Sequence, residues 1–352
     1  MDVFDEACAR GFMNIDRARA CLHGKKKSLG ESPEEQRAGM KTSGAGTKVF
    51  QWLLSTGVES DSSWLQPHGP GAAWIRKDII FDFLVLEGKQ EILWELFEPY
   101  LASNLRDGQD LLFQLSRSLA QNISIDAGIK SVVRANEILI KAQTPLEFRF
   151  RVLNPSISLL AHYIQKITLE ESQHPLALFD EFLGVVQELP SRSTISKSDL
   201  FIPQLYLCHP TIPDASLALR YLKGLNEASS EYLAKATKIL SGPLATLALD
   251  TAKQLIVDEQ FDDARWVLGF VQKTYPELDQ GNLQPQPEPT QRARAMELLG
   301  FVKQRYSQLK GLPVKMEQAE PKRSQTVKTT PVQKQDDIAS VKMLDRLDLA
   351  GS

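Results

Sequence analysis

The side chains that most often catalyse reactions or bind metal ions are few in this sequence, and their spacing forms none of the common catalytic motifs. The five histidines lie far apart, and none belongs to an HExxH motif or shares a helix face with another histidine. Cys208 and His209 are adjacent, so their side chains point apart and do not form a nucleophile and its base. Cys8, Cys21 and His23 lack a CxxC spacing and a fourth ligand. The sequence therefore predicts a protein that is not an enzyme and carries no metal or other cofactor.

A glycine-rich stretch, Thr42–Lys48, superficially resembles a loop that binds nucleotide phosphates. Gly39 and Gly44 have the spacing of two glycines in a Walker A motif, but Ala45 stands where that motif requires lysine. No buried strand is predicted before the stretch. We therefore interpret residues 24–46, which also contain three consecutive lysines, as a polar linker.

The remaining candidate chemistry is electrostatic and aromatic, and it lies in the last predicted helix of the body, residues 290–309. This helix and the residue after it combine cations with an aromatic ring: Arg292, Arg294, Lys303, Arg305, Tyr306 and Lys310. Cationic side chains bind RNA phosphates, and an aromatic ring stacks on an unpaired base. The alternative is a polar helix that closes the end of a helical array.

The tryptophans are interpreted mainly as core residues. Trp64 and Trp74 are exceptions, because they border a segment rich in glycine and proline. Aromatic side chains in loops frequently contact ligands. A recognition role is therefore expected only at these two tryptophans.

Two segments after residue 309 differ in composition from the rest of the chain. Residues 310–335 combine lysines and prolines with almost no large apolar side chains, so this segment is predicted to be a disordered linker. Residues 336–352 are predicted to form an amphipathic tail helix whose apolar residues recur at every third position: Ile338, Val341, Leu344 and Leu347. Such a helix either packs on its own protein or binds a partner, and the sequence favours neither alternative.

The overall composition is that of an ordinary globular protein of 352 residues, 42% hydrophobic and 24% charged. Three scattered cysteines suit a reducing compartment and do not form a disulfide framework. No apolar run reaches the roughly 18 residues that a membrane span needs. The 41 basic and 44 acidic side chains nearly cancel, so contact with nucleic acid requires a local basic patch.

Most of residues 47–309 show the apolar spacing of three and four residues that is typical of helices. Two helical hairpins are predicted, over residues 75–101 and 243–275, and Pro243 is placed at the first position of a helix. Further helices are predicted at about 48–55, 109–121, 128–142, 157–169, 175–189 and 214–239. Residues Leu146–Val152 alternate like a strand, but the capping box that begins at Thr144 favours a helix.

The stretch Glu259–Arg265, followed by Pro276, has the turn, the small residue and the closing proline of a tetratricopeptide unit. A comparable stretch, Gly11–Arg19, places Ala18 where the later stretch has Ala264. In these residues the chain resembles the tetratricopeptide and pentatricopeptide repeat families. The resemblance implies an all-α superhelix, or solenoid, of antiparallel helix pairs. It also implies a partial repeat unit at residues 1–23 and a helical-repeat domain at residues 47–309.

Residues Asp82–Gly88, followed by Trp94, are similar to divergent helical-repeat proteins of fungal organelles that resemble pentatricopeptide-repeat factors. That resemblance implies a partner, single-stranded RNA, and a role in mitochondrial gene expression. The alternative is a protein-interaction adaptor that docks a protein partner through its concave face or its tail helix. Three acidic residues among the first six argue against a transit peptide, so a cytoplasmic location is expected unless the true start lies upstream. The oligomeric state stays open.

Overall fold

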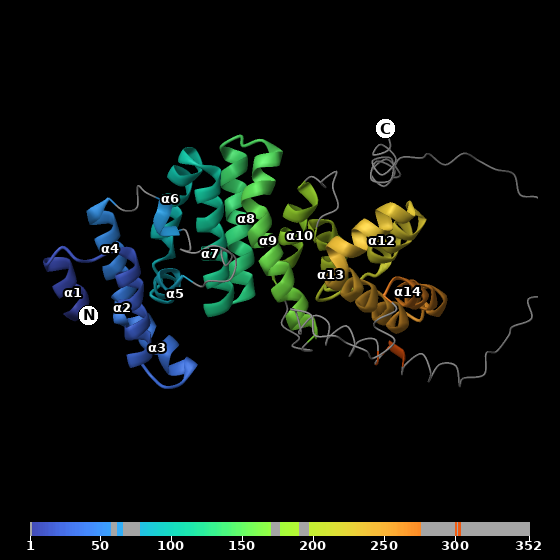
Figure 1. Cartoon of the computed structure of the whole chain (residues 1–352), viewed down its shortest axis with the longest axis horizontal. Coiled ribbons are helices and arrows are strands. Elements are labelled where there is room, and N and C mark those ends of the chain that lie inside the picture. The colour runs from blue at the N-terminus through green and yellow to red at the C-terminus, as the bar shows by residue number, and fades with distance from the viewer. Residues whose placement is uncertain are drawn as a thin grey trace, which may run out of the picture. The chain divides into compact units, whose positions relative to one another are not determined.

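The computed structural model describes residues 2–57, 62–65, 78–169, 177–189, 197–275, 300 and 302–303, and every regular element among them is a helix (Figure 1). The prediction of an all-α protein is therefore confirmed. No helix in this described part combines the length and the hydropathy that a bilayer-spanning segment requires. The chain divides into two compact units: unit 1 contains residues 1–191 and 208–212, and unit 2 contains residues 192–207 and 213–352. This division differs from the single repeat domain predicted over residues 47–309.

Unit 1 is built from helices that follow one another in chain order. They are α1 (Asp2–Ala9), α2 (Ile15–Ser28), α3 (Pro33–Ser43), α4 (Ala45–Thr56), the 3₁₀ turn η2 (Ser62–Leu65), α5 (Ile79–Leu86), α6 (Gln90–Ser103), α7 (Leu105–Asn122), α8 (Ile125–Lys141), α9 (Leu146–Leu169) and α10 (Phe179–Glu188). From α5 to α10, the main contacts join each helix to the next one or to the one after it. Figure 1 shows α7, α8 and α9 side by side in this order.

Helix α7 lies among α5, α6, α8 and α9, and all its side chains from Leu111 to Leu119 are buried. Buried polar groups need hydrogen-bond partners, and two serines of α7 find theirs on neighbouring helices. The Ser116 hydroxyl lies 2.8 Å from the Ser131 hydroxyl of α8, and Ser118 donates to the Asp82 carboxylate of α5 at 3.0 Å. These bonds fix the rotation of α7 against both neighbours.

Residues 24–46, predicted to be a polar linker, are largely helical: α2 continues to Ser28, and α3 begins at Pro33. A capping box starts α3. The Ser32 hydroxyl accepts a hydrogen bond from the Glu35 N–H at 3.2 Å, and the Glu35 carboxylate accepts one from the Ser32 N–H at 3.2 Å. Among the residues of α3 only Met40 is buried, so the helix carries almost no apolar stripe by which periodicity reveals it.

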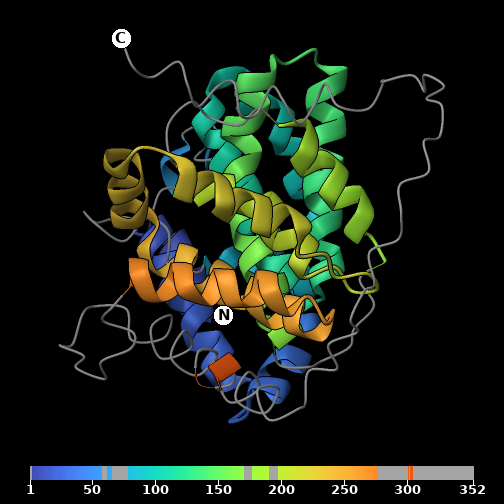
Figure 2. The same cartoon turned by 90° about the vertical axis from the view of Figure 1, so that its right-hand side faces the viewer.

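Unit 2 contains η3 (Lys197–Leu200), α11 (Phe201–Leu207), α12 (Ser216–Glu227), α13 (Ser230–Val257) and α14 (Phe261–Thr274), which is the orange helix of Figure 2. Here too, each α-helix packs mainly against the next one or the one after it. The second predicted hairpin is present as α13 and α14, and the first as α5 and α6.

Pro243, predicted at the first position of a helix, lies inside α13 instead. The single helix predicted over residues 214–239 is divided between α12 and the start of α13. The division occurs at Ser229, which caps the start of α13 and accepts a hydrogen bond from the Tyr232 N–H at 3.2 Å. A proline inside a helix removes one backbone hydrogen bond. Helix α13 nevertheless continues, because Leu240 and Leu244, one turn apart around the proline, are both fully buried.

The other predicted helices between residues 48 and 189 correspond to α4 and to α7–α10. Residues Leu146–Val152 form the start of α9, so the helix that the capping box predicts there is confirmed. The helix predicted over residues 290–309 lies outside the described residues except at positions 300, 302 and 303.

One type of turn recurs at four helix ends, each with a residue at positive φ: Gly11, Gly88, Gln143 and Glu259. At Gly88, the N–H groups of residues 87, 88 and 89 donate to the carbonyl oxygens of residues 83, 85 and 84, and residues 258, 259 and 260 repeat this pattern. The bonds satisfy carbonyl groups that a helix end leaves without partners. The four turns join α1 to α2, α5 to α6, α8 to α9 and α13 to α14.

Candidate functional site

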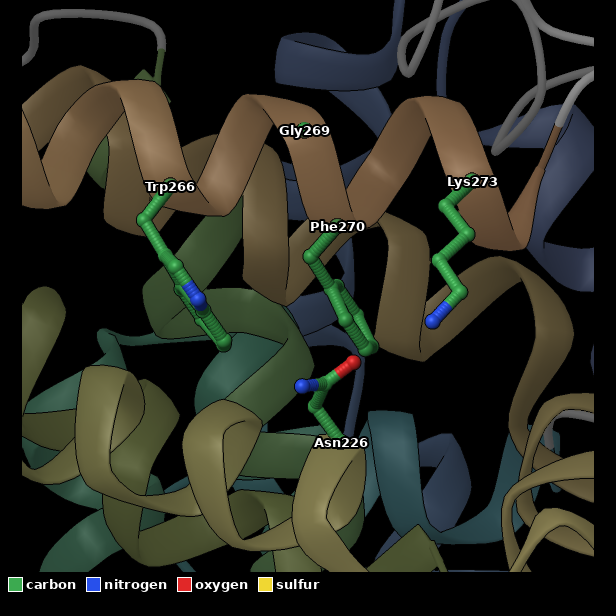
Figure 3. Close-up of a pocket in the computed structure, with 5 residues that line it drawn as sticks. All are labelled: Asn226, Trp266, Gly269, Phe270 and Lys273. Carbon is green, nitrogen blue, oxygen red and sulfur yellow. The ribbon is translucent and has the colours of Figure 1, made fainter.

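A small open pocket of about 250 Å³ lies on unit 2, between α14 and the end of α12. Its described lining consists of Asn226 from α12 and Trp266, Gly269, Phe270 and Lys273 from α14. The Trp266 and Phe270 rings are stacked, with centroids 5.9 Å apart and planes inclined by 14°. Figure 3 shows these rings and the Lys273 side chain projecting from α14 toward the side on which Asn226 lies.

The sequence of α14 places the pocket residues on one side of that helix. Trp266 and Phe270 are four residues apart, so they lie one turn apart on the same face, and Lys273 follows in the next turn. Ala264 and Val267 are buried, and α14 packs against α13. Phe270 is itself buried, whereas Trp266 is only partly buried. The core of the hairpin therefore holds one side of the aromatic pair in place, and the other side faces the pocket.

Lys273 lines the pocket, and a second lysine, Lys223, lies beside it in an ion pair. The Lys223 ammonium lies 5.7 Å from the Trp266 ring centroid and 2.8 Å from the Asp263 carboxylate. Both partners of this ion pair are about two-fifths exposed, so solvent screens the pair. Lys273 is exposed and has no ion pair with the described part of the chain. Its ammonium group is therefore free to bind an anion.

The lining offers three kinds of contact to a ligand. The partly exposed Trp266 ring provides a face on which a planar group stacks. The Asn226 amide both donates and accepts hydrogen bonds, and Lys273 contributes a positive charge. The described lining contains no carboxylate, histidine, serine or cysteine. Its chemistry therefore suits the binding of an aromatic group that carries a nearby negative charge.

Most of the residues that the sequence singles out for binding lie outside the described part of the chain. The predicted RNA-binding residues outside it are Arg292, Arg294, Arg305, Tyr306 and Lys310, and only Lys303 lies within it, partly buried. The tail residues Ile338, Val341, Leu344 and Leu347 also lie outside it, as do the segments 310–335 and 336–352. These interpretations stay predictions.

Sequence reasoning missed the pocket because it interpreted Trp266 as a core residue. A signal was present: Trp266, Phe270 and Lys273 follow at intervals of four and three residues, which is one face of a helix. Conversely, the recognition role expected of Trp64 is wrong. Trp64 is fully buried, and its indole N–H donates to the Tyr100 hydroxyl at 2.7 Å. Trp74 lies outside the described residues.

The glycine-rich stretch binds a carboxylate of its own chain. At the N-terminus of α4, the Glu87 carboxylate accepts hydrogen bonds from the Gly46 N–H at 2.9 Å and from the Thr47 N–H and hydroxyl at 2.8 and 2.7 Å. This is the position at which a helix N-terminus would bind a phosphate. Gly46 also lets α4 approach α5, because a Cβ atom there would lie 2.5 Å from the Phe83 Cβ. The stretch therefore anchors two helices to each other.

His209 ties the segment 208–212 to α10 within unit 1. Its Nδ1 accepts hydrogen bonds from the Thr211 and Ile212 N–H groups at 3.3 and 3.1 Å, so its Nε2 carries the proton and donates to Asp180 at 3.0 Å. The imidazole and the Phe179 ring also form a T-shaped pair, with centroids 5.0 Å apart. Both ring nitrogens are thus engaged in holding the segment.

The cysteine and histidine side chains near the N-terminus form no metal centre in the described part of the chain, which brings no three His, Cys, Asp or Glu side chains together as ligands. Burial raises the pKa of the Cys8 thiol, and Asp5 raises it further. A thiol with a raised pKa is a weaker nucleophile at neutral pH, because less thiolate is present. Burial lowers the pKa of His23, and the nearby charge of Lys26 lowers it further.

Comparison with known proteins adds no relative. No family model, no curated protein and no solved structure matches the chain. The pocket on α14 and the packing of the helices are therefore the observations that bear on function.

Proposed function

We propose that the protein is a non-catalytic helical-repeat scaffold in which antiparallel helix pairs stack as a solenoid within each unit. The packing from α5 to α10 and within unit 2 supports this, because there each helix contacts mainly the next one or the one after it, and in a solenoid each helix pair contacts the pairs before and after it. The recurring turn at Gly11, Gly88, Gln143 and Glu259 also supports it. Ala18 and Ala264, the small residues of the two similar stretches, are both fully buried, as expected where two helices cross closely.

The proposed ligand is single-stranded RNA, and the observation that carries this proposal is the pocket at which the partly exposed Trp266 ring, stacked on Phe270, lies beside Lys273. Every base has a π face, so an aromatic platform binds unpaired RNA with little dependence on sequence. Lys273 lies close enough to Trp266 along α14 to contact a phosphate next to the stacked base. The Asn226 amide is placed to form hydrogen bonds with the polar edge of that base. The cations predicted over residues 290–310 follow α14 in the sequence and would extend the contact.

The test is the binding of fluorescently labelled single-stranded RNA to the full chain, measured by anisotropy between about 50 and 200 mM salt. Trp266→Leu keeps an apolar side chain but removes the stacking surface, and it is expected to weaken binding by about 1–3 kcal/mol. Lys273→Gln is expected to lower the slope of log Kd against log salt by about 0.7, because one phosphate contact is lost.

The matched control is Lys235→Gln, which neutralises an exposed lysine of α13 that does not line the pocket. Its affinity and salt slope are expected to equal those of the unmodified chain. Two results would contradict the proposal: no retention of RNA at 50 mM salt, or equal losses in Lys273→Gln and Lys235→Gln. The mitochondrial location that accompanies this proposal is tested by imaging the tagged full-length chain in cells.

A further inference from the structure

Lys223 of α12 lies beside the pocket and contacts two side chains of α14. Its ammonium lies over the Trp266 ring, 5.7 Å from the ring centroid, and 2.8 Å from an Asp263 carboxylate oxygen. Asp263 and Trp266 are three residues apart, so they lie on one side of α14. Lys223 and Asn226, which lines the pocket, are likewise three residues apart on α12. Lys223 therefore lies where α12 and α14 meet, next to the partly exposed Trp266 ring.

The two contacts of Lys223 take the place of the contacts that a nucleotide would make. Carbon atoms in contact lie roughly 3.5–4 Å apart. A base stacked on this face of Trp266 would therefore fill the space under the ammonium, which would have to move aside. The Asp263 carboxylate meanwhile gives the ammonium the negative charge that a phosphate would give it. A stacked base thus competes with Lys223 for the ring, and its phosphate competes with Asp263 for Lys223.

The ion pair between Lys223 and Asp263 is of the kind that exchanges easily. Its side chains are 42% and 39% exposed, and exposed ion pairs contribute little to stability because solvent screens them. The lysine ammonium is a point charge on a flexible four-carbon stem, so it can turn toward another anion without any movement of α12. Asp263 lies in the first turn of α14, where the helix dipole favours a negative charge even without Lys223.

We propose that the ligand of the pocket displaces Asp263 as the partner of Lys223, so that Lys223 binds the phosphate of the stacked nucleotide. This inference rests on the proposed function, because it takes the ligand to be a nucleotide of single-stranded RNA. It adds Lys223 to Lys273 as a second phosphate-binding residue. It also assigns Asp263 the role of an internal competitor, which lowers the affinity of the pocket for its ligand.

The first test is Asp263→Asn, which removes the competing charge and keeps the size of the side chain. In the anisotropy titration with single-stranded RNA, this variant of the full chain is expected to bind about two- to fivefold more tightly, which corresponds to the strength of an exposed ion pair. A gain in affinity does not arise from misfolding. Lys223→Gln is expected to weaken binding and to lower the slope of log Kd against log salt by about 0.7, because one phosphate contact is lost.

The matched control is Asp262→Asn, which removes the same charge from the neighbouring residue of α14. Asp262 is exposed and pairs with Arg265 at 2.9 Å, so its loss measures the general effect of one negative charge fewer near the pocket. Asp263→Asn is expected to gain more than this control, and in the Lys223→Gln background its gain is expected to fall to that of the control. Equal gains in the two asparagine variants, or a gain of Asp263→Asn that persists without Lys223, would overturn the proposal.

Adenosine 5′-monophosphate, which carries one base and one phosphate, separates this inference from the proposed function. Its binding to the full chain is measured from the NMR shift of the Trp266 indole N–H, a signal assigned with Trp266→Leu. Asp263→Asn is expected to bind this probe about two- to fivefold more tightly than the unmodified chain.

The outcomes with the two ligands are distinct. If RNA binds with the expected loss in Trp266→Leu but Asp263→Asn gains nothing with either ligand, the inference alone is wrong. If RNA is not retained but the mononucleotide binds more tightly to Asp263→Asn, the proposed function alone is wrong. A Trp266 signal that neither ligand shifts would contradict both.

Discussion

Trp64 in unit 1 and Trp266 in unit 2 make nearly the same aromatic contact. Trp64 stacks on Phe81 with centroids 5.8 Å apart and planes inclined by 16°, and Trp266 stacks on Phe270 at 5.9 Å and 14°. Each tryptophan also has an ion pair beside it. For Trp64 the pair is Arg19–Asp78, at 2.7 Å, and for Trp266 it is Lys223–Asp263, at 2.8 Å.

The two sites differ in what they leave for a ligand. The ring surface and the polar groups of Trp64 are all engaged within unit 1. The ring is fully buried, its indole N–H donates to Tyr100, and Arg19 donates to its backbone carbonyl. Around Trp266 the ring borders an open pocket, and the neighbouring ion pair is accessible to water. The geometry of an aromatic pair is therefore not evidence of function by itself. The surface and the polar groups that the fold leaves uncovered are the evidence.

The largest expected difference between the sites is in stability. Trp64→Ala removes a fully buried indole and is expected to lower the free energy of unfolding of unit 1 by about 3–5 kcal/mol. Trp266→Ala removes a partly exposed ring, so it is expected to cost unit 2 about 1–2 kcal/mol. Urea titration followed by hydrogen-exchange mass spectrometry measures each unit separately. Equal losses in the two variants would remove the distinction between the sites.

Breaking the two ion pairs is also expected to cost unit 1 more free energy of unfolding than unit 2, but both losses are smaller than those of the tryptophan variants. Arg19→Met leaves the buried Asp78 carboxylate without its cation, and a loss of about 3 kcal/mol is expected in unit 1. Lys223→Met breaks a pair that solvent screens, so its cost is expected to stay below about 1 kcal/mol. The same unfolding measurement at low and high salt checks this, because only the cost of breaking the exposed pair should fall as salt rises. A cost of Arg19→Met that falls strongly with salt would contradict the assigned burial.

The smallest expected effect is that of a single hydroxyl group. Tyr100→Phe leaves the Trp64 indole N–H without the acceptor that it has now, and the expected cost is about 1–2 kcal/mol. The double variant with Trp64→Phe, which has no such donor, is the control. If the bond is the cause, Tyr100→Phe should cost much less in the Trp64→Phe background.

Turns and helix starts were largely predictable because their signals are local. The turns at Gly88 and Glu259 and the start of α9 after Pro145 all follow from residues within one or two helical turns. Two local predictions nevertheless differ from the structure. Residues 24–46 contain the capping box Ser32–Glu35, but their polar composition hides the helix. Pro243 resembles a helix start, but the buried leucines around it carry α13 through the proline.

The candidate site was less predictable than the fold. The intervals between Trp266, Phe270 and Lys273 place them on one side of α14, but intervals alone do not tell a buried face from an open one. Asn226 reaches the pocket from α12, 40 residues before Trp266 in the sequence. The spacing of residues along one helix does not show whether a helix distant in the sequence will pack against the aromatic face. The packing of that distant helix decides whether the aromatic face is core or binding surface.

By itself, the sequence determined the all-helical character of the described chain, because apolar spacing, caps and turn residues act over a few positions of backbone hydrogen bonding. Only the tertiary structure decided how the same residue types are used. Glu87 accepts hydrogen bonds at the N-terminus of α4 although it lies 40 residues after Thr47 in the sequence. Trp64 is buried within unit 1, whereas Trp266 borders a pocket in unit 2. These outcomes depend on contacts between residues far apart in the chain, and such contacts form only when whole helix faces pack together.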